Sequence, residues 1–331
     1  MVNKMTKMAK IERTMKKYLL LLTIIALIAG TITGYYMAPT IKQHKELLKY
    51  IIIILAISTL YPSMIKLRLG KIGRAIRDIK SLFAAFLLTL FIMPVLSMLI
   101  ANYLPEPTIK LGYVAANIVP ASSASVGYVL LAEGSIELAT SLVFISILGS
   151  LFVGPLYLEY YGSLEMIKIP ISKIAISMLI ALITPLVLGQ ITRYYLIHRK
   201  QVDERKIGPH LSFITMTCML ILIFLLIMSK ARIIVNKPNI AITIILGQAF
   251  IILAVLGVLW IITKTLRIRY GEHTAIAYVS MTKNESAATI ISAVALGGAA
   301  TVAPAIIPAI QPVLCIIYLH ILVRIRRRRV Y

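Results

Sequence analysis

Charged residues are scarce in this chain of 331 residues: they make up 14% of it, and only 12 residues are Asp or Glu. An ordinary soluble domain is about a quarter charged. Here 60% of the residues are hydrophobic and the mean hydropathy is +0.91. A soluble globule has no place to bury so much Ile and Leu, so the composition excludes that class and predicts an all-α polytopic membrane protein.

The sequence also lacks the motifs of an enzyme or a metalloprotein. Its two cysteines, Cys218 and Cys315, lie far apart in apolar segments, which excludes a disulfide framework and a CxxC metal pair. The five histidines do not cluster, and no HExxH, GxSxG or P-loop sequence occurs. We therefore expect no enzymatic activity, no bound metal and no cofactor.

Long apolar stretches are what the sequence has instead. A spanning helix needs roughly 20 mostly apolar residues, and ten segments qualify: 18–38, 50–66, 82–102, 111–132, 136–157, 169–192, 211–229, 239–263, 274–296 and 303–323. The first is too long for the apolar region of a signal peptide and lacks a small-x-small cleavage site. We interpret it as a retained first span.

The 35 basic residues give a net charge of +23, a balance that can indicate nucleic-acid binding. With ten spans and a cytoplasmic N-terminus, however, 25 of them fall in cytoplasmic segments and nine in outside loops. This asymmetry follows the positive-inside rule. It predicts a plasma-membrane protein with both termini in the cytoplasm. The Arg-rich C-terminal tail is interpreted as an anchor at anionic lipid headgroups, without a nucleic-acid partner.

Spans four and nine carry polar residues near mid-membrane, where the other spans are plain Ile/Leu stretches. Pro120 interrupts the fourth span, because proline removes a helical hydrogen bond. The fourth span also contains Asn117, Ser122, Ser123, Ser125 and Gly127, and the ninth contains Ser280, Thr282, Lys283, Asn284, Glu285 and Ser286. Both spans hold the fourth place in a half of five spans, 1–162 and 163–331. Because five is odd, the halves have inverted topology, and paired interruptions in inverted repeats indicate the central site of a transporter.

Lys283 and Glu285 are the charged residues that lie in the middle of a predicted span. A charge at the bilayer centre costs about 3 kcal/mol even on a lenient scale. At a spacing of two residues they do not face each other on a regular helix, although a broken backbone can bring them together. Two interpretations stay open, a functional pair of charges and a structural internal ion pair.

Several short motifs occur in the order of a known family. They are Ile-Met-Pro at 92–94, Pro-Ala-Ser-Ser-Ala-Ser at 120–125, Ala-Glu-Gly at 132–134, Pro155, and Lys-Asn-x-Ser-Ala-Ala at 283–288. Together they resemble the bile acid:sodium symporter family, in the superfamily that also holds arsenical-resistance permeases and auxin-efflux-type carriers. The resemblance implies a panel domain of spans 1, 2, 6 and 7 and a core domain of spans 3–5 and 8–10. The broken spans four and nine would cross at the substrate and ion site.

The positions that bind sodium in that family carry other side chains here. The family's Gln before Met-Pro, Asn of the fourth span, two hydroxyl residues of the fifth, and acidic residue and Gln of the ninth correspond to Thr89, Val126, Ala139, Val143, Val279 and Lys283. Hard cations need oxygen ligands, which Val and Ala side chains do not supply. We hypothesise that the Lys283 ammonium stands where the sodium charge would sit. Glu285 would then carry a proton or hold Lys283, and the coupling ion stays open.

The sequence therefore predicts a secondary active transporter that moves a small organic anion by alternating access, without coupling to sodium. Its partners would be that anion and the lipid bilayer. The residues expected to bind substrate are Asn117, Ser122, Ser123, Ser125, Thr282, Lys283, Asn284, Glu285 and Ser286. The alternatives are an exporter of arsenite-like or other small solutes, although the thiol of the arsenical branch is missing from the fourth span, and a channel or sensor on the same scaffold.

Overall fold

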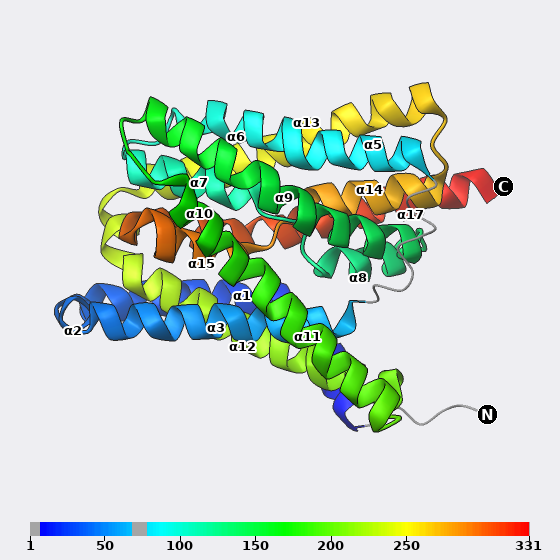
Figure 1. Ribbon diagram of the computed structural model, residues 1–331, viewed down its shortest axis with the longest axis horizontal. Helices are drawn as coiled ribbons and strands as arrows, with labels where there is room; N and C mark the ends of the chain where they lie inside the picture. Colours follow the sequence, from blue (N-terminus) through cyan, green and yellow to red (C-terminus); the bar gives the residue numbers. More distant parts are fainter. Residues whose placement is uncertain (1–6, 68–77, 331) are drawn as a thin grey trace. The chain divides into compact units, whose positions relative to one another are not determined.

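The computed structural model describes residues 7–67 and 78–330 (Figure 1). Five of the basic residues counted above lie outside the described residues: Lys4, Arg68, Lys71, Arg74 and Arg77. The described part of the chain is helical, with one isolated β-bridge and no strand. Eight of its helices are long and apolar enough to cross a membrane. The expectation of an all-α polytopic membrane protein is confirmed at this level.

Contacts divide the chain into two compact units. Unit 1 comprises Met1–Leu67 and Leu179–Pro238, and unit 2 comprises Arg68–Met178 and Asn239–Tyr331. Each unit thus takes one segment from each half of the sequence, and neither is a contiguous half of the chain.

Unit 1 is a bundle of long helices. Its elements are α1 (Lys7–Tyr36), α2 (Ala38–Gln43), α3 (Lys45–Lys66), η3 (Leu179–Ile183), α11 (Thr184–Tyr194), η4 (Tyr195–Arg199) and α12 (Glu204–Asn236). Helices α1 and α3 pack on α12, and α11 packs on α3. The contact between α1 and α12 depends on small residues, since a Cβ atom at Gly34 would lie 2.2 Å from the Met228 carbonyl oxygen. Such close backbone approach is typical of helix pairs in membranes.

From Lys7 onward the basic N-terminal segment is helical, so the first helix begins before the predicted span at residue 18. Helix α1 starts at Lys7, eleven residues earlier than the predicted span. Lys, Arg, Met and Glu are good helix formers, and Glu12 and Lys16 form an ion pair of 2.5 Å one turn apart. Hydropathy marks the apolar part of a helix and misses such polar extensions.

Unit 2 contains the two interrupted spans. Its elements are α5 (Ile79–Leu87), η2 (Leu88–Ile92), α6 (Met93–Ala101), α7 (Pro107–Ile118), α8 (Ala124–Leu131), α9 (Ile136–Leu164), α10 (Ile171–Met178), α13 (Pro238–Leu266), α14 (Tyr270–Met281), α15 (Glu285–Ile291), η5 (Ser292–Leu296), η6 (Gly298–Thr301), α16 (Val302–Ile306), η7 (Ile307–Ala309) and α17 (Gln311–Val330). The predicted spans 111–132 and 274–296 are each split into two shorter helices. In the described part of the chain, eight helical segments are therefore long and apolar enough to cross a membrane, where ten spans were predicted.

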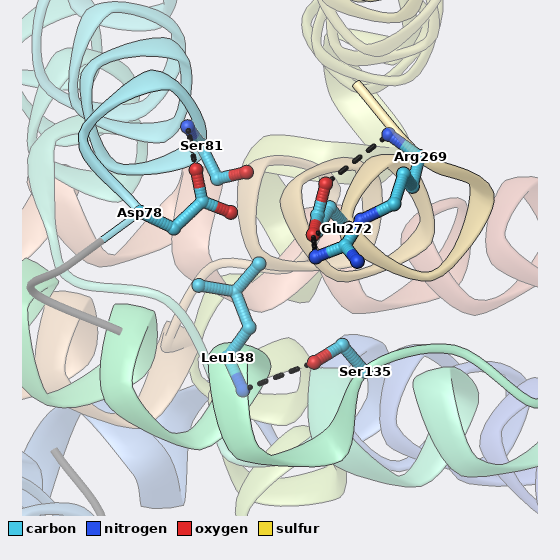
Figure 2. A network of polar contacts seen from close by, with 6 residues as sticks. All are labelled: Asp78, Ser81, Ser135, Leu138, Arg269 and Glu272. Atoms are coloured by element: carbon cyan, nitrogen blue, oxygen red, sulfur yellow. Dashed lines mark hydrogen bonds and ion pairs between the residues drawn. The ribbon is translucent and has the colours of Figure 1, made fainter. Parts of the chain in front are cut away.

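Several helices of unit 2 begin with a side-chain cap, and Figure 2 shows three of these caps. A cap satisfies backbone N–H groups that have no partner in the first turn. The caps are Asp78 accepting from the Ser81 N–H (3.2 Å), Ser135 accepting from the Leu138 N–H (3.4 Å), and Glu272 accepting from the Arg269 N–H (3.1 Å). They fix where α5, α9 and α14 start.

The connections of unit 2 fall into two groups. In the first group, the turn at 132–135 contacts the start of α14, because the Ser135 N–H donates to the Gly271 carbonyl at 2.9 Å. Glu133 of the same turn pairs with Arg326 near the end of α17. In the second group, Lys110 at the start of α7 forms an ion pair of 2.9 Å with Glu165, which follows α9.

Candidate functional site

The two interrupted helices of unit 2 meet at their breaks. Between α7 and α8 the chain is extended, with φ and ψ of −61° and 157° at Val119. The break between α14 and α15 is also extended, with −104° and 111° at Thr282. Residues Ala121 and Lys283 form an isolated antiparallel bridge. Its hydrogen bonds run from the Ser122 N–H to the Thr282 carbonyl (2.9 Å) and from the Asn284 N–H to the Pro120 carbonyl (3.0 Å).

Side chains satisfy much of the remaining exposed backbone at the breaks, as a site without bulk water requires. Asn284 caps α15, with its Oδ1 accepting from the Ala287 N–H at 3.2 Å. The Ala121 N–H donates to the Ser146 hydroxyl at 3.0 Å. The Ser125 hydroxyl donates to the Ser122 carbonyl at 2.8 Å.

Gln311, the first residue of α17, binds the backbone of the second break on both sides. The Lys283 N–H donates to the Gln311 Oε1 at 3.0 Å, and the Gln311 Nε2 donates to the Lys283 carbonyl at 3.4 Å. Gln311 is 9% exposed. It was not among the residues predicted for the site. Its position within the tenth predicted span is the signal that could have identified it, because polar residues within spans are rare and face the protein interior.

The Lys283 ammonium lies among backbone carbonyl oxygens. Its Nζ donates to the Thr89 carbonyl at 2.9 Å and to the Val119 carbonyl at 3.2 Å. The residue is 1% exposed, one of the largest fully buried side chains in the described part of the chain. Both acceptors belong to irregular backbone of other elements, η2 and the first break. The Lys283 side chain therefore donates hydrogen bonds to backbone carbonyl oxygens of η2 and of the α7–α8 break.

The local sequence explains why the Thr89 carbonyl needs a donor. In the π-helical turn η2, Met93 donates its N–H to the Leu88 carbonyl, five residues back. The same pattern would pair Thr89 with residue 94, but Pro94 has no N–H. The carbonyl is thus left without a helical partner, and Lys283 provides one from another segment. The Val119 carbonyl is freed in a comparable way, since the helix stops before Pro120.

Glu285, two residues further on, has no such partner. Both of its carboxyl oxygens are inaccessible to solvent and make no hydrogen bond with any described residue. Lys283 and Glu285 do not form an ion pair, because the Lys283 Nζ contacts the two carbonyl oxygens instead. The interpretation of a structural ion pair is therefore not supported by this conformation.

Asn117 lies fully buried in the last turn of α7, directly before the break, and its amide is bound to another side chain. Its Nδ2 donates to the Gln248 Oε1, and the Gln248 Nε2 donates back to the Asn117 Oδ1, each at 3.1 Å. This reciprocal amide pair joins α7 to α13. Both polar atoms of the Asn117 amide are engaged, so in this conformation Asn117 connects helices. Gln248, in the middle of the eighth predicted span, was also missed from the sequence.

The other predicted substrate residues differ in their access. Ser122 and Ser123 are half-buried in the first break. The Thr282 hydroxyl donates to the Tyr278 carbonyl at 2.7 Å, and Thr282 is 1% exposed. Ser286, at the start of α15, is 7% exposed. The first break thus offers the more accessible hydroxyl groups.

The positions predicted to correspond to the family's sodium ligands are mostly apolar. Ala139 and Val143 are buried in α9, Val279 is buried in α14, and Val126 is half-buried in α8. The Thr89 hydroxyl lies 3.3 Å from the hydroxyl of Ser280.

Thr89 and Val279 also line a cavity of about 10 Å³, with mainly apolar neighbours. That volume accommodates about one water molecule. The side chains at these positions do not form an oxygen cage for a cation.

A comparison with models of protein families finds a match over more than half of this chain. The model of the sodium bile acid symporter family matches residues 52–237. The chain belongs to this family. The resemblance inferred from the short motifs is thereby confirmed, whereas a search of curated proteins finds no match.

The sodium bile acid symporter family consists of membrane transporters, so this protein is a transporter with a small-molecule substrate, in keeping with the expectation that it is not an enzyme. The matched region includes the first break, between α7 and α8, and ends before α14. The roles of Lys283 and Glu285 therefore depend on the geometry described above.

Proposed function

We propose that this protein is a secondary active transporter that moves a small organic anion across the plasma membrane by alternating access, without coupling to sodium. The observation that carries the proposal is the Lys283 ammonium, held by two backbone carbonyl oxygens where the family has a sodium ligand. Carbonyl oxygens are also what a hard cation such as sodium prefers. The covalently attached cation supports a site that needs no sodium.

An anionic substrate is supported by the first break. Helix α8 begins at Ala124, directly after the half-buried hydroxyl residues Ser122 and Ser123. The N-terminus of a broken helix carries a partial positive charge that favours anionic groups in transporters. The acidic side chain near the breaks is Glu285, and its buried oxygens do not face solvent.

The two compact units support a panel and a core. Unit 1 holds predicted spans one, two, seven and most of six, while unit 2 holds three to five and eight to ten. We assign unit 1 as the panel and unit 2 as the core, and propose ten spans arranged as inverted repeats, 1–162 and 163–331. The broken fourth and ninth spans occupy matching places in those repeats. Transport would proceed by movement of one unit relative to the other.

The two groups of connections in unit 2 support the predicted alternation of the spans between the two sides of the membrane, and the charge asymmetry supports the orientation. Segments predicted to be cytoplasmic contact one another, as in the pairs Ser135–Gly271 and Glu133–Arg326. Segments predicted to be outside do likewise at the 102–110 and 157–168 connections, where the Tyr161 hydroxyl donates to the Asn102 Oδ1 at 3.2 Å. An even number of spans with both termini in the cytoplasm gives this sorting.

Flux measurements test the proposal. Liposomes that contain the full-length protein are loaded with unlabelled taurocholate or with one of a panel of smaller carboxylates. Uptake of the same anion in labelled form is then followed in sodium buffer and in potassium buffer. We expect saturable uptake and counterflow for at least one anion, with equal rates in the two buffers. Linear, non-saturating flux would identify a channel. Uptake that requires sodium would contradict the proposed role of Lys283.

Serine variants test whether the hydroxyl groups of the first break contact the substrate. The matched control is Ser163→Ala, near the end of α9, where the serine hydroxyl donates to the Tyr160 carbonyl of the same helix at 2.7 Å. We expect its flux to equal that of the wild type. Ser122→Ala and Ser123→Ala at the first break should raise KM for the anion, and unchanged KM in both would remove these hydroxyls from the substrate site.

A further inference from the structure

Glu285 is a buried acidic group without a counter-charge in contact. Both carboxyl oxygens are inaccessible and have no hydrogen-bond donor among the described residues. The nearest cation in sequence, Lys283, directs its ammonium to the carbonyl oxygens of Thr89 and Val119. A carboxylate in this position would have no hydrogen-bond donor and no cation in contact with its oxygens.

The elements packed against α15 supply no cation in contact with Glu285. Helix α15 packs on α7, α10, α16 and η5, and the last two contain no titratable residue. On α10, Lys173 is exposed. On α7, Lys110 is bound to Glu165 at 2.9 Å, and Tyr113 is fully buried with a hydroxyl that has no partner among the described residues. Tyr113 is thus the neutral titratable group on the neighbouring helix.

The relative energies favour a neutral carboxyl group. An unpaired charge inside a protein costs several kcal/mol after relaxation. The first turn of a helix stabilises a negative charge by only about 0.3–1 kcal/mol at exposed positions and up to about 2 kcal/mol in partly buried ones. A neutral carboxyl group without partners costs about 1–3 kcal/mol. Burial therefore outweighs the helix terminus, and the protonated form is the stable one here.

We propose that Glu285 is the proton-binding site of the transport cycle. One carboxyl oxygen takes a proton from water when the site is open to solvent and keeps it in the buried conformation described here. The proton returns to water when the site opens again. This proposal rests on the proposed transport function and identifies the coupling ion, which the absence of sodium ligands leaves open.

Infrared spectroscopy tests the protonation without a substrate. The other eleven acidic residues lie in tails, connections or span ends, so at neutral pH a protonated-carboxyl band from the full-length protein should report Glu285. We expect that band in the wild type, its loss in Glu285→Gln, and its retention in Glu159→Gln, which changes an exposed residue of α9. Glu285→Asp should keep a shifted band if the Gln variant folds poorly. A wild type without the band, or a band that persists in Glu285→Gln, would overturn the proposal.

Transport measurements connect the proton to the cycle. In liposomes an inward proton gradient should raise the net uptake of taurocholate by the wild type and should have no effect on Glu285→Gln, while taurocholate counterflow persists in that variant. Counterflow and net uptake lost together would assign Glu285 a structural role. If the infrared band is present but the wild type moves no anion, the proposed function fails and the proton site stands as a binding site only.

Discussion

Replacement of Lys283 should destabilise the protein and create a cation requirement. In Lys283→Ala the carbonyl oxygens of Thr89 and Val119 lose their donor. An unsatisfied buried acceptor costs about 1–3 kcal/mol, so the loss of both hydrogen bonds should lower the free energy of unfolding by about 2–6 kcal/mol. Membrane-protein hydrogen bonds average only about 0.6 kcal/mol in double-mutant cycles, which favours the lower half of that interval. Lys283→Met is the matched variant, because it keeps the apolar stem and removes only the donors.

The variant leaves two carbonyl oxygens that a small cation can bind. Thermal unfolding of detergent-solubilised protein is measured in sodium, potassium and choline chloride at equal ionic strength. A cation present at a hundred times its Kd stabilises the folded state by about 2.7 kcal/mol. We expect such recovery by sodium in Lys283→Ala and no difference among the salts in the wild type.

Two results would refute this reasoning. One is a wild type that sodium stabilises over potassium by as much as it stabilises the variant, because the ammonium would then not occupy the cation position. The other is an unchanged unfolding temperature of Lys283→Met, because the carbonyl oxygens would then not depend on the lysine. Neither measurement needs a known substrate.

Two further substitutions test the packing of unit 2 by the same unfolding assay. Gly112→Ala should cost about 1–3 kcal/mol, as overpacked sites do, because its Cβ would lie 1.9 Å from the Ala300 carbonyl oxygen. In Gly127→Ala the new Cβ meets open space within helix α8, so this variant should be more stable by about 0.5–1 kcal/mol, because Ala favours a helix over Gly. For the buried amide pair, a double-mutant cycle of Asn117→Ala and Gln248→Ala should give a coupling energy between about 0.6 and 1.7 kcal/mol. A coupling of zero would contradict the reciprocal hydrogen bonds.

Hydropathy predicted where the apolar helices lie and predicted their ends poorly. The span expected at 211–229 is the middle of α12, which runs over Glu204–Asn236. Polar residues that favour helix extend such elements beyond the apolar stretch, and no change in hydrophobicity marks the true ends. The interruptions of the fourth and ninth spans were recognisable because proline and consecutive polar residues are incompatible with a plain spanning helix.

The partners of Lys283 lay beyond sequence reasoning for a geometric reason. Its acceptors are main-chain carbonyl oxygens, which every residue has, so the residue types at Thr89 and Val119 do not indicate this contact. The Thr89 carbonyl is free because a π-helical turn places its expected donor at Pro94, and a regular α-helical turn would place it at Met93 instead. The choice between the two turns depends on packing, which the sequence does not display. Gln248 and Gln311 could have been predicted from the sequence, because both are amide residues inside apolar spans.

A covalently attached cation has a consequence for energetics that a bound sodium ion does not. A bound sodium ion can leave with each cycle, so its gradient can drive transport. In the proposed cycle the Lys283 side chain contacts the carbonyl oxygens of the broken backbone and stays in the site, so no sodium gradient drives transport. A transporter built this way must take its energy from the substrate gradient or from another exchangeable charge. Glu285 is the other charged residue in the middle of a predicted span, and a carboxyl group exchanges protons with water. If Lys283 replaces the sodium ion, Glu285 is therefore the residue at which ion coupling should be tested.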